Sequence, residues 1–154
     1  MPLNAMSPDE RRVFVIFNPA SGRGRGEKRI GRFLSLLGSH LPGFTHAGTS
    51  RAGEEGDLAE QAIADGFNLI VAVGGDGTWS NIADRIVSSH KKDVALGLLA
   101  SGTGNDFGRN FSVSIRNPEL AVKTLAKGQV RSVDVGRVVS RGTPLRAQAG
   151  SPGA

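Results

Sequence analysis

The chain has 154 residues, of which 38% are hydrophobic, and this is enough for one domain with a sizeable core. It contains no cysteine, so disulfides and thiolate metal sites are excluded, and no apolar run approaches the roughly 20 residues of a membrane-spanning helix. The formal charge of +5 favours anionic partners such as nucleotide phosphates, anionic lipid surfaces or nucleic acid, and charge alone does not choose among them.

Residues 13–17 (VFVIF) form the first predicted element, a short apolar run rich in β-branched and aromatic side chains. Such a run predicts a strand that is buried on both faces. A helix is expected next, because apolar residues recur at the spacing of one helix face, and Pro42-Gly43 ends it. The residues of this face are Ile30, Phe33, Leu34 and Leu37.

The middle of the chain repeats this alternation of strands and helices. Residues 44–49 are a weak strand candidate, and residues 69–73 (LIVAV) are the clearest buried strand. One amphipathic helix is predicted between them, and a second follows the LIVAV run. Their apolar stripes consist of Leu58, Ala59, Ala62 and Ile63 in the first helix and of Trp79, Ile82, Ala83, Ile86 and Val87 in the second.

The C-terminal third carries weaker signals. Residues 94–100 (VALGLLA) predict another buried strand, and residues 118–127 predict a helix with Pro in its first turn. Residues 105–110 are expected to form a short helical turn, and residues 130–139 a last strand. Residues 140–154 (SRGTPLRAQAGSPGA) have no period and little apolar content, which predicts disorder.

Strands that alternate with helices predict an α/β fold, a Rossmann-like parallel sheet with helices on both faces. We expect a polar N-terminal lead over residues 1–11, one folded domain over residues 12–139 and a disordered tail over residues 140–154. In such folds, ligands bind beyond the carboxyl ends of the strands. Three loops at those ends are rich in Gly, Ser, Thr and Asn, and their convergence predicts a binding site.

The first of these loops comprises Asn18, Pro19, Ala20, Ser21 and Gly22. Pro19 fixes the turn after the strand, and Ser21 offers a hydroxyl. Backbone N–H groups at the start of the following helix could cradle a phosphate. An ordinary strand-to-helix turn is the alternative interpretation.

The second loop comprises Gly74, Gly75, Asp76, Gly77 and Thr78. Three glycines around one acid are costly for folding, and they suit a backbone that passes close to a ligand. Asp76 could accept a hydrogen bond from a hydroxyl or help to hold Mg²⁺ through water, and Thr78 could cap the next helix or bind phosphate. The alternative is a tight turn with Asp76 as a helix cap, which would need fewer glycines.

The third loop comprises Gly102, Thr103, Gly104, Asn105 and Asp106, and it again follows an apolar run. Thr103 and Asn105 have side chains suited to phosphate or base contacts, and a capped glycine-rich turn is the alternative. None of the loops matches the phosphate-binding pattern G-x-x-x-x-G-K-[ST] or the dinucleotide pattern G-x-G-x-x-G. These two familiar nucleotide signatures are therefore unsupported.

The motifs N-P-x-S-G, G-G-D-G-T and G-T-G-N-D-F follow predicted strands in this order. Together they resemble the catalytic domain of diacylglycerol kinases and related bacterial lipid kinases, a group that includes sphingosine and ceramide kinases. The resemblance runs from about Arg12 to Val138. G-G-D-G-T alone is less specific, because NAD kinases share it and phosphofructokinases have a close variant. The resemblance implies the nucleotide-binding fold that these kinases have in common.

The resemblance also implies that ATP, with Mg²⁺, is the phosphoryl donor and that a lipid hydroxyl such as that of diacylglycerol is the acceptor. Asp76 is the acid of the glycine-rich loop and the candidate catalytic residue. Trp79 also lies on an apolar helix stripe, so its side chain is expected in the core. The implied nucleotide contacts are Asn18, Pro19, Ala20, Ser21, Gly22, Thr49, Gly74, Gly75, Asp76, Gly77, Thr78, Trp79, Ser80, Gly102, Thr103, Gly104 and Asn105.

The chain departs from the family's pattern in two places. Asn81 stands where the family often has Glu, in G-G-D-G-T-x-x-E, and Asp84 stands where Asn is frequent. Family members also continue into a β-rich domain that supplies much of the lipid site, magnesium ligands and, in several bacterial members, the catalytic carboxylate. Residues 132–138 resemble the start of that domain, and we expect the rest of it to be missing here. We interpret the tail as the product of a frameshift or premature end near Val139, which strand patterns in another reading frame would support.

The sequence therefore predicts the ATP-binding half of a cytoplasmic lipid kinase that meets its substrate at the inner face of a membrane. NAD kinase is the alternative enzyme, and a non-catalytic nucleotide-binding module is the alternative from a different class. Nucleic acid is not expected as a partner, because only 5% of the residues are aromatic and no binding motif is present. A homo-oligomer stays an open option.

Overall fold

The computed structural model describes residues 7–19, 26–51, 53–100, 117–130, 132, 135–139 and 144–149. Its elements follow the predicted alternation of strands and helices. In chain order they are η1 (Pro8–Glu10), β1 (Val13–Phe17), α1 (Gly26–His40), β2 (Thr45–Gly48), α2 (Glu54–Ala64), β3 (Leu69–Gly74), α3 (Asp76–Ser88), β4 (Ala95–Ala100), α5 (Pro118–Ala126), β5 (Val135–Val139) and β6 (Pro144–Ala149).

The main sheet has four strands in the order β2-β1-β3-β4, and all neighbouring pairs are parallel. Phe17, the last residue of β1, pairs with Gly48 on one side and with Val73 on the other. On the next strand pair, Gly74 pairs with Ala100. Because all four strands run in the same direction, their carboxyl ends lie along one edge of the sheet. The predicted α/β fold is confirmed.

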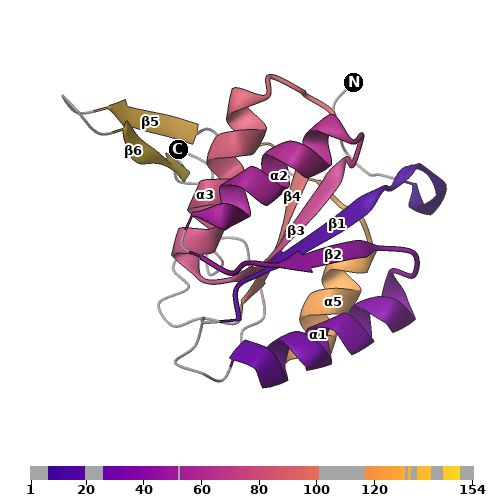
Figure 1. Cartoon of the computed structure of the whole chain (residues 1–154). Helices are drawn as coiled ribbons and strands as arrows, with labels where there is room; N and C mark the ends of the chain where they lie inside the picture. The colour runs from indigo at the N-terminus through magenta and orange to yellow at the C-terminus, as the bar shows by residue number, and fades with distance from the viewer. Residues whose placement is uncertain are drawn as a thin grey trace.

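Helices cover both faces of this sheet, as Figure 1 shows. The side chains of a strand alternate between its two faces, so Val13 and Val15 point to one layer and Ile16 points to the other. The first layer is formed by α1 and α5, which contact each other, and the second by α2 and α3. Residues 69–73 are fully apolar because β3, next to β1 in the middle of the sheet, is buried on both faces.

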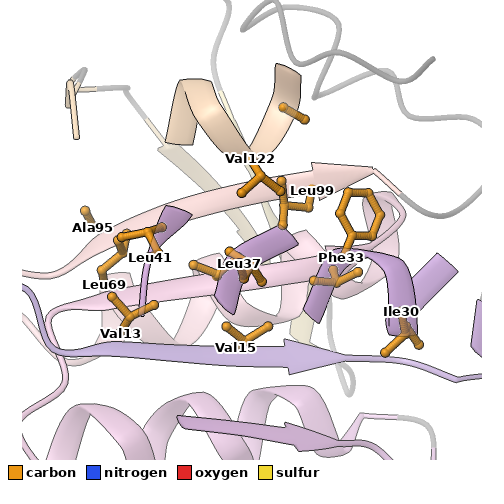
Figure 2. Packing of buried hydrophobic residues seen from close by; sticks show 13 residues of the cluster. Val13, Val15, Ile30, Phe33, Leu37, Leu41, Leu69, Ala95, Leu99 and Val122 are labelled. Atoms are coloured by element: carbon orange, nitrogen blue, oxygen red, sulfur yellow. The ribbon is translucent and has the colours of Figure 1, made fainter. Parts of the chain in front are cut away.

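The layer under α1 and α5 contains the larger core cluster, shown in Figure 2. The predicted stripe of α1 supplies Ile30, Phe33 and Leu37, and these pack on the strand residues Val13, Val15 and Leu99. Leu37 is fully buried. Leu34 is only partly buried at the edge of the cluster, because it lies at the side of the helix face.

The opposite layer is centred on Trp79 of α3, which is 1% exposed and packs with Ile16, Ile63 and Ile82. The prediction that Trp79 belongs to the core is confirmed. Val87, predicted on the same stripe, is 43% exposed. At 3.6 residues per turn it is rotated about 80° from Trp79, so it leaves the stripe near the end of the helix.

β5 (Val135–Val139) lies within the last strand predicted over residues 130–139, whereas β6 (Pro144–Ala149) corrects the expectation of a wholly disordered tail. β5 and β6 form a separate antiparallel pair, with a register shift between Arg137 and Val139, and β6 lies against α3. Leu145, Ala147 and Ala149 alternate with polar residues, which is a weak strand signal because alanine is depleted in strands; pairing through backbone hydrogen bonds does not require a stronger one. The helical turn predicted over residues 105–110 lies outside the described residues. No helix in the described part of the chain is long and apolar enough to cross a membrane.

Candidate functional site

Several predicted site residues leave the sheet side by side at its carboxyl edge. The N–H of Asn18 donates to the carbonyl of Val73 at 3.4 Å, and the N–H of Thr49 donates to the carbonyl of Phe17 at 2.9 Å. Each bond extends a parallel ladder by one residue beyond the strand. Asn18, Thr49 and Gly74 therefore begin their loops in adjacent positions, on β1, β2 and β3.

The junction between β3 and α3 is very short. β3 ends at Gly74 and α3 begins at Asp76, so Gly75 alone connects them, in an extended conformation with φ −107° and ψ −167°. The N–H of Trp79 donates to the carbonyl of Gly75 at 3.1 Å, which is the first bond of the helix. The N-terminus of α3 thus lies directly at the carboxyl edge of the sheet. The first turn of a helix favours anions, through its N–H groups and its dipole.

The side chains of this junction divide into inner and outer ones. Thr78 is buried and faces Gly74, and Trp79 is buried in the core. Asp76 and Ser80 are half-buried beside the opening of the helix. Trp79 was included among the implied nucleotide contacts, but its burial leaves only its backbone for such a contact. Asp76 and Ser80 are the side chains of α3's first turns that can reach a ligand.

The loop between β2 and α2 is held by a carboxylate. Glu54 Oε2 accepts hydrogen bonds from the N–H and the Oγ of Ser50, both at 2.8 Å, and from the N–H of Arg51 at 3.2 Å. These bonds, first of all the one from the backbone N–H of Ser50, hold the pKa of Glu54 below its ordinary value of 4.5. The backbone next to Thr49 is therefore fixed by a side chain that the sequence analysis did not single out.

A second acid of the same helix turns inward. Glu55 is 5% exposed, and its Oε1 accepts a hydrogen bond of 2.6 Å from Asn81 Nδ2 of α3. Sequence reasoning also missed Glu55, although one signal was present. Glu55 lies three and four residues before Leu58 and Ala59 of the apolar stripe, so the helical period places it on the buried face.

The remaining predicted contacts lie outside the described residues. These are Ala20, Ser21 and Gly22 in the first loop and Gly102, Thr103, Gly104 and Asn105 in the third. Asn18, Pro19, Thr49 and the residues of the second loop are brought to one edge, as predicted for a shared site. In the described part of the chain, no three His, Asp or Glu side chains are grouped as a metal site.

Comparisons with known proteins give this edge a context. The family model described as the diacylglycerol kinase catalytic domain matches residues 12–138. A diacylglycerol kinase of Bacillus subtilis (strain 168) is 32% identical over 131 residues, which are 83% of this chain and 42% of that protein. A diacylglycerol kinase of Mycobacterium tuberculosis (strain H37Rv) is 28% identical over 127 residues, or 82% of this chain and 40% of that protein.

The solved structures agree. A crystal structure of a diacylglycerol kinase from Bacillus anthracis (strain Sterne) superposes with a TM-score of 0.71 at 27% identity, and covers 81% of this chain and 45% of that one. The chain therefore spans less than half the length of these relatives. With the match over residues 12–138 and the shared fold, it belongs to the diacylglycerol kinase catalytic domain family.

Proposed function

We propose that this chain is the ATP-binding half of a lipid kinase, which transfers a phosphoryl group to a lipid hydroxyl such as that of diacylglycerol. One observation carries the proposal: the N-terminus of α3 opens at the carboxyl edge of the sheet, next to Asn18 and Thr49. A helix N-terminus at the carboxyl end of parallel strands suits a phosphate group. Membership of the family supports a kinase that acts on a lipid.

The ATP contacts in this proposal come from all the loops at the edge. Asn18 and Thr49 lie on the same side of the N-terminus of α3, at the ends of β1 and β2, and the N–H groups of the first turn of α3 face the phosphates. Asp76 lies in that turn and can hold Mg²⁺ through water, since carboxylate oxygens and phosphate oxygens are ligands that Mg²⁺ prefers. Ser21 and Thr103, with their neighbouring glycines, complete the set.

Phosphoryl transfer is a reaction that these groups can support. Phosphoryl transfer depends mainly on positioning and on neutralising the phosphate charge, and Mg²⁺ supplies part of that neutralisation when it is bound with ATP. Backbone N–H groups and one acid are the parts that this domain would contribute. Because the chain spans 40–45% of its relatives, we assign the lipid contacts mainly to a further part of the kinase, acting at a membrane surface.

Two measurements test the proposal. Isothermal titration of the purified chain with MgATP should show saturable binding at one site, and no binding would reject the nucleotide site. The chain is then incubated with labelled ATP and either diacylglycerol vesicles or NAD. Labelled lipid supports the lipid kinase, and labelled NAD moves the assignment to an NAD kinase. Binding without transfer to either acceptor supports nucleotide binding alone in this chain, as the ATP-binding half of a kinase or as a nucleotide-binding module.

A further inference from the structure

Glu55 is a buried acid in the layer beside the proposed nucleotide site. Its carboxylate comes from the first turn of α2, and it accepts the 2.6 Å hydrogen bond from Asn81, in the second turn of α3. We propose that Glu55 is a positioning residue, whose contact with Asn81 fixes the N-terminal turn of α3 where the nucleotide phosphates bind. The inference rests on the proposed function, because it assigns a role within that same site.

Burial of this carboxylate needs a physical reason. Removing a charged group from water costs several kcal/mol unless it is paired or hydrogen-bonded. Two features offset the cost here: the amide of Asn81 donates to the carboxylate, and the N-terminus of α2 favours a negative charge. An apolar pair would pack α2 against α3 without that cost, so the polar pair indicates a demand for one defined position of α3.

A short series of contacts links Glu55 to the junction between β3 and α3. Asn81 lies three residues after Thr78, so both side chains lie on neighbouring positions of one helix face. Thr78 is buried and packs directly on Gly74, the last residue of β3. A shift of α3 relative to α2 would therefore move Thr78 against the strand and displace the first-turn N–H groups from the sheet edge.

The pair also gives a physical account of the departure at residue 81. Since Asn81 Nδ2 is 2.6 Å from Glu55 Oε1, a carboxylate at residue 81 would meet the carboxylate of Glu55. Like charges at that separation repel strongly in a buried place. Glu55 and Asn81 are thus matched to each other, and α2 supplies the carboxylate of this pair.

An isosteric exchange tests the role. Asn81→Asp places two carboxylates face to face, and it should weaken MgATP binding about tenfold, which corresponds to about 1.4 kcal/mol. Glu55→Gln keeps an oxygen that can accept from Asn81, and its effect should stay within about threefold. The double variant, Glu55→Gln with Asn81→Asp, restores a donor–acceptor pair of reversed polarity, so its affinity should return to within about threefold of wild type.

The matched control is Glu60→Gln. Glu60 also reaches from α2 to α3, where it forms an ion pair with Arg85, but its side chain is 66% exposed. Its loss should leave MgATP affinity unchanged. Equal weakening by Glu60→Gln and Asn81→Asp would mean that any loosening of α2 on α3 has this effect, and it would overturn the assignment. So would a double variant that binds no better than Asn81→Asp.

Hydrogen exchange separates this inference from the proposed function. In the protein without nucleotide, Asn81→Asp should speed amide exchange over residues 74–80, and the double variant should reverse the change. If wild type binds no MgATP, the proposed function fails, and the exchange rates still decide on positioning. Unchanged exchange over residues 74–80 in Asn81→Asp would refute the role of Glu55 by itself.

Discussion

A Cβ atom placed on Gly74 would lie 2.8 Å from the Oγ1 of Thr78 and 2.9 Å from its Cβ. Real Cβ atoms do not approach other heavy atoms so closely, and Thr78 is buried and cannot move away. The first glycine of G-G-D-G-T is therefore required by the sharp turn from β3 into α3. This requirement exists without any ligand.

Gly74→Ala should destabilise the fold by about 1–3 kcal/mol, because the added methyl group overpacks the junction. Gly31→Ala is the matched control, since a Cβ on Gly31 meets nothing within 4 Å on the exposed face of α1. That variant should stabilise the protein by about 0.5–1 kcal/mol. Urea denaturation measures both, and equal stability of the two variants would contradict the packing requirement.

The carboxylate of Glu54 makes the stability of the β2–α2 loop dependent on pH. Its folded-state pKa is lowered by the hydrogen bonds from Ser50 and Arg51, so the stabilisation is present above the unfolded value near 4.5. It is lost as the pH falls through the folded-state pKa. Glu54→Gln removes the charge and with it this dependence.

We therefore expect wild type to be more stable than Glu54→Gln at pH 7, with a difference that shrinks as the pH falls through the lowered folded-state pKa of Glu54. Denaturation of both proteins across this range measures the difference. The same variant should also weaken MgATP binding at pH 7 if Thr49 is a contact. A stability difference that does not vary with pH would show that the charge of Glu54 has no role in holding the loop.

Secondary structure was predicted best where burial leaves a direct pattern in the sequence. The LIVAV run and the spacing of Ile30, Phe33 and Leu37 predicted β3 and α1, because burial on two faces or on one face produces these patterns directly. The sheet edge that carries the proposed site followed from the parallel topology. The three glycines of the second loop are a less specific sign of a ligand than the sequence suggested, because Gly74 is required by its packing against Thr78.

Contacts between distant parts of the chain could not be predicted in the same way. The pair of Glu55 and Asn81 joins residues 26 positions apart, and no local pattern shows that these two side chains meet. The strand β6 was missed because the alternation in its sequence rests mostly on alanine, a weak strand former, while its pairing with β5 uses the backbone. Side-chain hydrogen bonds and edge pairing depend on tertiary proximity, which local patterns do not contain.

Asp76 is the acid of the glycine-rich loop, and it is half-buried at the first position of α3. Asp76→Ala should weaken MgATP binding about tenfold or more, because a hydrogen bond to a charged group contributes about 1.5–3 kcal/mol. The fold should change little, since the core packing of α3 comes from Trp79 and Ile82. Titration with MgATP and with ATP plus a chelator distinguishes a role in holding Mg²⁺ from a direct contact. Equal MgATP affinity in both proteins would discard the role of Asp76.

Gly75→Val tests whether glycine is needed at this position to leave space for a ligand or to allow the backbone conformation. The φ of −107° and ψ of −167° at Gly75 are an extended conformation that valine adopts readily, so the backbone itself does not require glycine. If phosphates lie against the opening of α3, the valine side chain occupies their space and MgATP binding should fall by at least about a hundredfold. The melting temperature should fall modestly, because Gly75 is the N-cap of α3 and valine is a poorer N-cap residue. Gly75→Ala, with a smaller side chain, should give an intermediate loss of affinity.

Full binding by Gly75→Val would mean that the nucleotide does not approach this turn. The proposed site would then have to move along the sheet edge towards Asn18 and Thr49.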